Sequence, residues 1–243
     1  MNLPPSIKNS LGEKLFFSFH PGQKNDCLLV LGHGVTGNKD RPLLVALAEG
    51  LAALGWPCLR ISFSGNGESE GRFEDSTISK EVADLQSVID AIPDDIKIAY
   101  CGHSMGGAVG VLTSVRDERI RVLISLAGMV QTQEFYKREF ADVIPGQGTM
   151  WDEPTCPLSQ AYVDDLTQIG SILPAASAVE VPWLLIHGLD DDVVPSSDSD
   201  AAYEVAAEPK KRVIIEGAGH SFGDAIYNKI CEEINLWLGR HLQ

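Results

Sequence analysis

Seven short apolar runs alternate with helix-length segments along this chain of 243 residues, and this alternation constrains its fold most strongly. Most runs are continuously apolar, which is typical of strands that are buried on both faces. The pattern predicts an α/β fold with one doubly wound, mostly parallel sheet and helices on both faces. No helix separates the first two strands, so we expect the first strand to be an antiparallel edge. The expected strands are residues 15–19, 27–31, 58–63, 96–101, 121–126, 183–187 and 212–215, and the expected helices are 42–54, 79–91, 105–115, 197–207 and 226–241.

One segment, residues 130–179, interrupts this alternation because it contains no clear core strand. It carries several aromatic residues, including Trp151, and four prolines. A connection of about fifty residues in a compact domain is usually functional. We therefore predict a lid inserted within a single domain that spans residues 1–243. The alternative is a pair of ordinary packing helices in a long connection.

The charge balance limits the classes of partner. The chain has 34 acidic and 19 basic residues, which give a formal net charge of −15. This sign disfavours binding to nucleic-acid phosphates, so we expect no nucleic-acid partner, and it mildly repels anionic substrates and membrane surfaces. The apolar runs are far shorter than the roughly 20 residues of a membrane span, so no membrane association is expected.

Other features of the sequence concern its cellular compartment and cofactors. Residues 1–14 lack the apolar core of a secretory signal, so we expect a cytoplasmic protein. The five cysteines show no CxxC spacing, and HExxH is absent, so we expect neither disulfides nor a metal. We also expect no other cofactor, and a monomer or homodimer whose partner is a small-molecule substrate.

The sharpest functional motif is Gly102-His103-Ser104-Met105-Gly106, which stands between an expected strand and an expected helix. A serine on such a turn needs a strained backbone, and the flanking glycines allow the chain to approach itself closely. The turn exposes the serine hydroxyl above the carboxyl edge of the sheet. The motif arises by chance in about one chain in ten of this length, and a helix-capping serine is the alternative. The strand–turn–helix context favours Ser104 as a nucleophile.

A serine hydroxyl needs a base that removes its proton and a carboxylate that orients this base. Of the six histidines, His220 lies in a loop of small residues after the last expected strand. Such a loop can carry an imidazole over the strand ends, so we predict that His220 is the base. His33 and His103, which also follow or end strands, and Trp151 of the inserted segment are candidates for substrate binding.

The acid and the oxyanion hole are expected in two other loops. Asp190, Asp191 and Asp192 follow strand 183–187. Burying more than one of these charges is costly, so only one of them is expected to be the acid, and the residues alone do not decide which.

Residues 32–39, after strand 27–31, are rich in glycine, so backbone N–H groups can reach a reacting carbonyl. The N–H groups of Val35 and Met105 would then form an oxyanion hole. A phosphate-binding loop is the alternative, but the pattern GxxxxGK[ST] is absent.

These motifs resemble those of the α/β-hydrolase superfamily from about residue 14 to residue 242. The order Ser104, aspartate, His220 is that of the family's triad. The stretch 187–195, HGLDDDVVP, resembles the family's H-G-x-x-D-x-x-V-P, which places the catalytic acid on Asp191. The loop 32–39, GHGVTGNK, resembles that of small lidded carboxylesterases, including cinnamoyl and feruloyl esterases. This resemblance implies oxyanion donors at Val35 and Met105, and an insertion after the sixth core strand, where residues 130–179 lie.

The resemblance implies a serine esterase that cleaves a carboxylic ester through a Ser-His-Asp triad and an acyl-enzyme. The chain departs from this type at two positions: Val35 often corresponds to a bulky aromatic residue, and Met105 corresponds to a position where feruloyl-type members often have Gln. A phenolic substrate is therefore not implied. Acyl-peptide or thioester hydrolysis on the same triad, and a binding protein without turnover, are the alternative functions.

Overall fold

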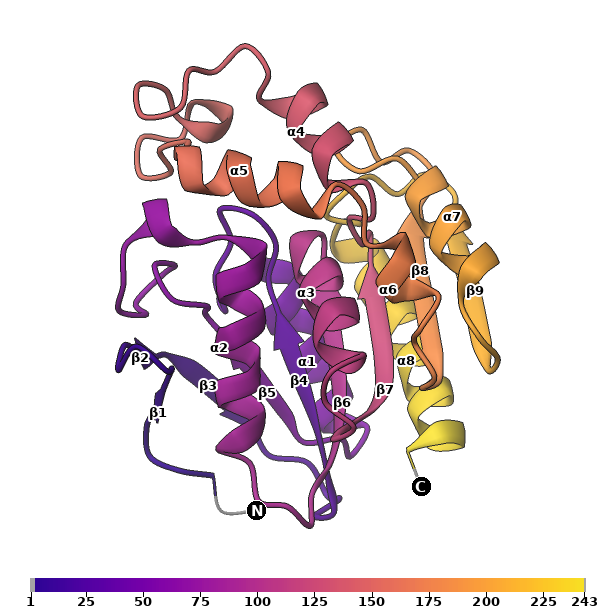
Figure 1. Ribbon diagram of the computed structural model, residues 1–243. Coiled ribbons are helices and arrows are strands. Elements are labelled where there is room, and N and C mark those ends of the chain that lie inside the picture. The colour runs from indigo at the N-terminus through magenta and orange to yellow at the C-terminus, as the bar shows by residue number, and fades with distance from the viewer. Residues whose placement is uncertain (1–2, 243) are drawn as a thin grey trace.

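The computed structural model describes residues 3–242, and a seven-stranded sheet forms its centre (Figure 1). Its strands are β3 (Phe17–His20), β4 (Cys27–Gly32), β5 (Cys58–Ile61), β6 (Lys97–His103), β7 (Ile120–Leu126), β8 (Trp183–Gly188) and β9 (Lys210–Ile215). Their order across the sheet is β3-β5-β4-β6-β7-β8-β9, and every neighbouring pair is parallel except β3 with β5. The predicted doubly wound sheet with an antiparallel first strand is confirmed.

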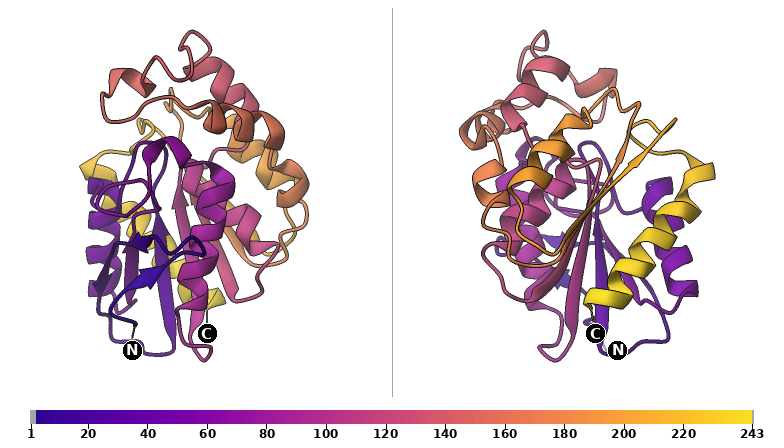
Figure 2. Two further views of the ribbon diagram at one scale, coloured as in Figure 1. Left: turned by 60° about the vertical axis from the view of Figure 1, so that its left-hand side comes forward. Right: turned by 90° about the vertical axis from the view of Figure 1, so that its right-hand side faces the viewer.

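Helices cover both faces of the sheet (Figure 2). Helices α1 (Pro42–Ala53) and α8 (Asp224–His241) pack together on one face, and α2 (Ile78–Asp90) and α3 (Met105–Ser114) pack together on the other. Along β4, Leu28 and Val30 join the apolar core beneath α2 and α3, whereas Leu29 and Leu31 join the core beneath α1 and α8. Successive residues thus point into two separate cores, which is why the strand is apolar at every position.

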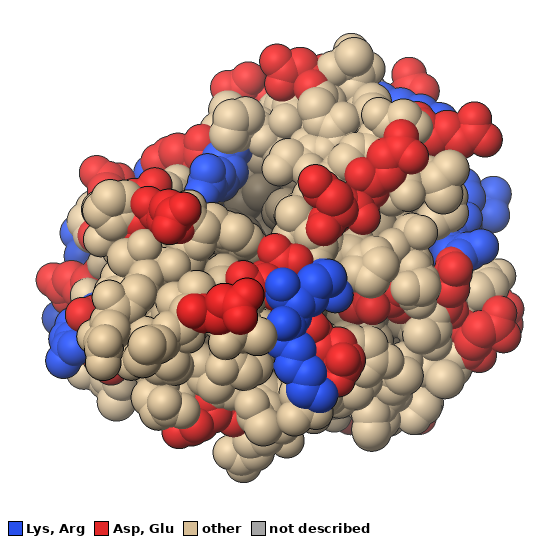
Figure 3. All heavy atoms as spheres, turned by 90° about the horizontal axis from the view of Figure 1, so that it is seen from above, with Lys and Arg blue, Asp and Glu red and all other residues tan. Residues whose placement is uncertain are grey.

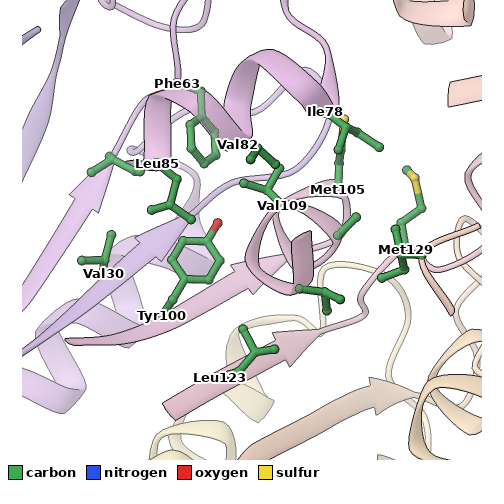
Figure 4. Close-up of a cluster of buried hydrophobic side chains, with 14 of the residues drawn as sticks. Val30, Phe63, Ile78, Val82, Leu85, Tyr100, Met105, Val109, Leu123 and Met129 are labelled. Carbon is green, nitrogen blue, oxygen red and sulfur yellow. The ribbon is translucent and has the colours of Figure 1, made fainter. Parts of the chain in front are cut away.

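The core between the sheet and the helices α2 and α3 also supports the turn after β6 (Figure 4). Val30 of β4, Leu85 of α2 and Met105 of α3 all contribute buried side chains to it. Tyr100 of β6 is fully buried in this core and donates a hydrogen bond from its hydroxyl to the carbonyl of Gly106, at 3.1 Å. This bond joins the strand before the turn to the helix after it.

The inserted segment lies above the carboxyl ends of the strands (Figure 1). It contains α4 (Thr132–Glu139), the 3-10 turn η2 (Met150–Asp152), α5 (Gln160–Ile169) and α6 (Leu173–Ala176), and α7 (Ser197–Val205) follows β8. Helix α5 packs against α4 and α2. The sequence did not place α4 and α5 individually; α4 is mostly polar and buries only Thr132 and Phe135, so it shows few apolar positions.

Several smaller elements lie outside the predicted pattern. The expected strand 15–19 divides into the end of β2 (Lys14–Leu15), which pairs with β1 (Ile7–Lys8), and most of β3. A 3-10 turn, η1 (Phe73–Asp75), precedes α2. All five cysteines are free and buried. Within residues 3–242, no helix combines the length and apolar character that a membrane span needs, and no cluster of three or more His, Cys, Asp or Glu is arranged to hold a metal ion.

Candidate active site

Ser104 lies on the turn between β6 and α3, with φ 55° and ψ −119°. A positive φ is uncommon for a residue with a side chain, and such strain clusters at functional sites. The turn is also sterically tight, since a Cβ atom on Gly102 would lie 2.1 Å from the carbonyl oxygen of Gly106. The N–H of Ser104 donates to the carbonyl of Leu126 in β7, at 2.9 Å. The sheet thus holds Ser104 at its carboxyl edge in a strained conformation.

The structure distinguishes the three consecutive aspartates after β8. Asp190 and Asp192 are exposed, whereas the side chain of Asp191 has no exposed area. Nδ1 of His220, in the loop after β9, lies 2.9 Å from Oδ2 of Asp191. An ionised carboxylate only accepts hydrogen bonds, so Nδ1 carries the proton and Nε2 is left as the basic nitrogen.

Asp191 accepts hydrogen bonds on both carboxylate oxygens. The N–H groups of Val193 and Val194 each donate to Oδ1 at 2.9 Å, and Nε2 of His187 lies 3.1 Å from Oδ2, the oxygen that also binds His220. Burial alone would raise the pKa of this carboxyl. The hydrogen bonds from His187 and His220 outweigh burial and hold the pKa of Asp191 well below its usual range.

His187, the partner of Asp191 at the end of β8, was not a predicted site residue. Its side chain is fully buried, and Nε2 also lies 2.9 Å from the carbonyl oxygen of Val194. Both neighbours of Nε2 are acceptors, so this nitrogen carries the proton, and Nδ1 accepts from the hydroxyl of Ser199 at 2.5 Å. The sequence signal was a histidine four residues before the acid. Whether this histidine contacts the acid depends on the fold of the turn between them.

A cavity of about 500 Å³ opens at this edge of the sheet. Ser104, His220 and Val35 line it, together with Trp151 of the inserted segment. Seen from above, the surface of the molecule is visibly hollowed (Figure 3). Among the hydrogen bonds of residues 3–242, none joins the hydroxyl of Ser104 to His220. In enzymes without bound substrate, a hydrogen bond of this kind is often long. What the structure shows for Ser104 and His220 is that both line the same cavity.

The backbone N–H groups of Val35 and Met105 are available donors in the described part of the chain, since no hydrogen bond there uses either of them. Met105 is the first residue of α3, where an N–H has no partner inside the helix. The two side chains differ in their surroundings. Val35 lines the cavity, whereas Met105 is buried and its sulfur lies 3.6 Å from the hydroxyl of Tyr162.

His33 borders the cavity, but both of its ring nitrogens are engaged within the protein. Nδ1 donates to the carbonyl of Gly34 at 2.9 Å, and Nε2 accepts from the N–H of Phe63 at 3.1 Å. Burial lowers the pKa of His33 to about 4, so the ring is neutral at pH 7. His33 therefore fastens the loop after β4 to the end of β5.

His103 and Trp151 also line the cavity. His103 is half-buried, and its Nε2 donates to the backbone carbonyl of His220 at 2.9 Å, which fixes the loop that carries His220. Burial lowers the pKa of His103 to about 3. Trp151 is 44% exposed, its ring centroid lies 4.8 Å from that of Phe140 with the ring planes tilted by 59°, and its Nε1 donates to Glu139 at 3.0 Å.

Comparisons with known proteins agree with this architecture. A family model described as serine aminopeptidase, S33 matches residues 23–149. An uncharacterized protein of Mycobacterium tuberculosis is 30% identical over 184 residues, which cover 75% of this chain and 59% of that protein. Human palmitoyl-protein thioesterase ABHD10, a mitochondrial protein, is 28% identical over 162 residues, which cover 62% of this chain and 52% of that protein. The chain thus spans between half and three fifths of the length of these relatives.

The structure of Est1E from Butyrivibrio proteoclasticus, solved with ferulic acid bound, is similar over almost its whole length. The TM-score is 0.86 at 26% identity, and the match covers 98% of this chain and 99% of Est1E. The family model and this similarity together show that the chain belongs to the serine aminopeptidase S33 family of the α/β-hydrolase superfamily.

Proposed function

We propose that this chain is a serine hydrolase that cleaves carboxylic esters, with Ser104 as nucleophile, His220 as base and Asp191 as the residue that orients the base. The proposal is carried by the 2.9 Å hydrogen bond between Nδ1 of His220 and Asp191, at the edge of the cavity that Ser104 also lines. The strained turn at Ser104 and the membership of a hydrolase family support it.

In the proposed reaction, Nε2 of His220 takes the proton of the Ser104 hydroxyl as its oxygen attacks the ester carbonyl. His220 then gives this proton to the departing alkoxide, and an acyl group remains on Ser104. Water, deprotonated by His220, attacks the acyl-enzyme; the bond between the acyl carbon and Ser104 breaks, the Ser104 oxygen takes the proton back from His220, and the acid is released. Asp191 keeps the proton on Nδ1 throughout and stabilises the charged imidazolium, which its depressed pKa allows because the carboxylate stays ionised.

A negative charge develops on the carbonyl oxygen during the attack, and hydrogen-bond donors that already point at this oxygen stabilise it. The N–H groups of Val35 and Met105 take this role in our proposal, because both are free of other partners in residues 3–242. Loss of one such donor typically raises the barrier by about 3 kcal/mol. We further propose that residues 130–179 act as a lid, with Trp151 as the wall that contacts the substrate.

The first test replaces the nucleophile. Ser104→Ala should lower kcat for p-nitrophenyl acetate by several orders of magnitude, because the remaining groups cannot form an acyl-enzyme. Ser114→Ala, at the far end of α3, is the matched control and should remain close to wild type. A fluorophosphonate probe should label the wild type and not Ser104→Ala. An unchanged rate in Ser104→Ala, or a folded wild type that the probe never labels, contradicts the proposal and favours a binding protein.

Thioester hydrolysis is a second candidate, favoured by the similarity to a relative that is named a palmitoyl-protein thioesterase. The same serine, imidazole and oxyanion donors would serve either bond. A matched acyl ester, thioester and anilide, compared by kcat/KM, separates these activities. A preference for the thioester favours this second function, and a preference for the anilide favours a peptidase.

A further inference from the structure

Arg41 is a basic residue in the wall of the cavity. It precedes the first residue of α1, is exposed and lines the cavity that holds Ser104. Its Nη2 donates to the backbone carbonyl of Thr36, at 2.7 Å. Thr36 adopts a positive φ of 56° and directly follows Val35. The guanidinium is thus tied to the same loop that carries a proposed oxyanion donor.

Arg41 has no acidic partner in the described part of the chain, although an aspartate precedes it directly. Asp40 instead pairs with Nζ of Lys39 at 2.7 Å and with Nη1 of Arg60 at 2.9 Å. A guanidinium carries five N–H donors in a planar fork that matches a carboxylate. The contact with Thr36 uses only one side of this fork, so donors remain for a ligand.

The rest of the cavity wall leaves this positive charge uncompensated. No Asp or Glu lies among the residues that line the cavity, and Arg41 is its one Lys or Arg. His33 and His103 are neutral at pH 7 because burial lowers their pKa values to about 4 and about 3. The first turn of α1 also lines the cavity, so the positive end of the helix dipole lies near it.

The overall charge of the chain has the opposite sign, and acidic side chains are visible on the surface around the hollow (Figure 3). Exposed charges are largely screened beyond about 8 Å at physiological ionic strength. A group bound beside Arg41 therefore responds more to this guanidinium than to the net charge of −15. The expectation of mild repulsion between the chain and anionic substrates does not extend to this cavity.

We propose that the cavity selects esters that carry a carboxylate in addition to the scissile bond, and that Arg41 binds this carboxylate. The inference rests on the proposed function, because it names the substrate class of the same site. The carboxylate belongs to either the acyl or the alcohol part of the ester. Arg41 is a specificity-determining residue in this account and takes no part in bond cleavage.

The test compares matched pairs of esters. On the acyl side, mono-p-nitrophenyl adipate is compared with p-nitrophenyl hexanoate, which has the same chain length and no carboxylate. On the alcohol side, 4-carboxyphenyl acetate is compared with 4-acetylphenyl acetate. The wild type should favour the anionic ester of at least one pair by about tenfold in kcat/KM, as expected for a charge-assisted contact. Raising the salt concentration should reduce this ratio.

Three variants connect the preference to Arg41. Arg41→Gln should bring the ratio of the two kcat/KM values close to one, and Arg41→Lys should retain a large part of it. Arg121→Gln, at the opposite end of the sheet in β7, removes an equal charge and should keep the wild-type ratio.

The outcomes separate the two proposals. A wild type that hydrolyses neutral esters and shows no preference in either pair overturns the inference and leaves the proposed function intact. A preference that persists in Arg41→Gln overturns the inference as well. A protein that cleaves no ester and does not react with a fluorophosphonate removes the proposed function, and the inference with it.

Discussion

Two buried carboxyl groups, Asp191 at the end of β8 and Glu81 on α2, behave in opposite ways. The side chain of Asp191 has no exposed area, and Glu81 is 1% exposed. Asp191 accepts hydrogen bonds from two backbone N–H groups and two imidazoles. Glu81 accepts one, from the hydroxyl of Ser76 at 3.2 Å, and its Oε2 has no partner among residues 3–242.

The pKa values of the two groups differ accordingly. Burial, reinforced by the negative charge of Asp84, raises the pKa of Glu81 well above its usual value. The pKa of Asp191 lies well below its usual range despite burial, because donors surround both oxygens. Two carboxyl groups whose side chains are both shielded from solvent thus have pKa values shifted in opposite directions, and the donors around Asp191 are the main reason that its pKa is lowered. The donors around Asp191 keep its carboxylate charged beside the imidazole of His220.

The largest effect is expected when the carboxylate of Asp191 is replaced by an amide. Asp191→Asn should lower kcat by about 10⁴-fold, because an amide cannot accept on both sides and no longer fixes the proton on Nδ1 of His220. The measurement is kcat for p-nitrophenyl acetate at neutral pH. Asp192→Asn is the matched control, since this neighbour is exposed, and it should stay within a few-fold of wild type. Equal losses in the two variants would contradict the assignment of Asp191.

A second test removes one of the donors that distinguish Asp191 from Glu81. His187→Phe leaves Oδ2 of Asp191 with one imidazole donor fewer, so the carboxylate is less well positioned, and kcat/KM should fall by about 10-fold to 100-fold. His187→Gln keeps an N–H₂ donor near the position of Nε2 and should recover most of this loss. The thermal unfolding of both variants is measured alongside. Equal losses in the two variants would mean that His187 acts only through packing.

The sequence predicted most of the sheet and the positions of Ser104 and His220, for one physical reason. Strands covered on both faces are continuously apolar, and the loops at their carboxyl ends meet at one edge. The loops after β6, β8 and β9 therefore converge, and any Ser, Asp or His in them is a candidate. Within the run of three aspartates the residues alone could not choose, since the choice depends on which side chain the turn buries.

Other parts of the site depend on contacts that no local pattern reveals. The pairing of Asp40 with Arg60, twenty residues away, is what leaves Arg41 without a partner, and it becomes visible only when β5 lies beside the loop after β4. Helices in residues 130–179 were given only as an alternative, and their bounds were not predicted, for a related reason. Helix α4 is short and buries only two residues, and α5 packs against α4 and α2, so tertiary contacts rather than a local pattern define these helices.

The smallest expected effect concerns stability at Glu81. A carboxyl whose pKa is raised in the folded state contributes stability at pH values below its unfolded pKa, near 4.5, and loses this contribution as the pH rises toward the folded pKa. Glu81→Gln cannot ionise, so its stability should not show this loss. The melting temperature of Glu81→Gln relative to wild type should therefore rise between pH 5 and pH 8, by a few degrees, or on the order of 1 kcal/mol.

The sign of this trend separates Glu81 from Asp191. For Asp191 the folded pKa is lowered, so its contribution is present above the unfolded pKa, near 3.8, and is lost as the pH falls through the folded pKa. Asp191→Asn should consequently show its largest stability deficit at neutral pH, where Glu81→Gln shows its largest gain. Glu118→Gln, at an exposed position, controls for removal of one negative charge. A flat difference between Glu81→Gln and wild type from pH 5 to pH 8 would mean that Glu81 ionises as readily in the folded chain as in the unfolded chain, and that one donor is enough to compensate burial.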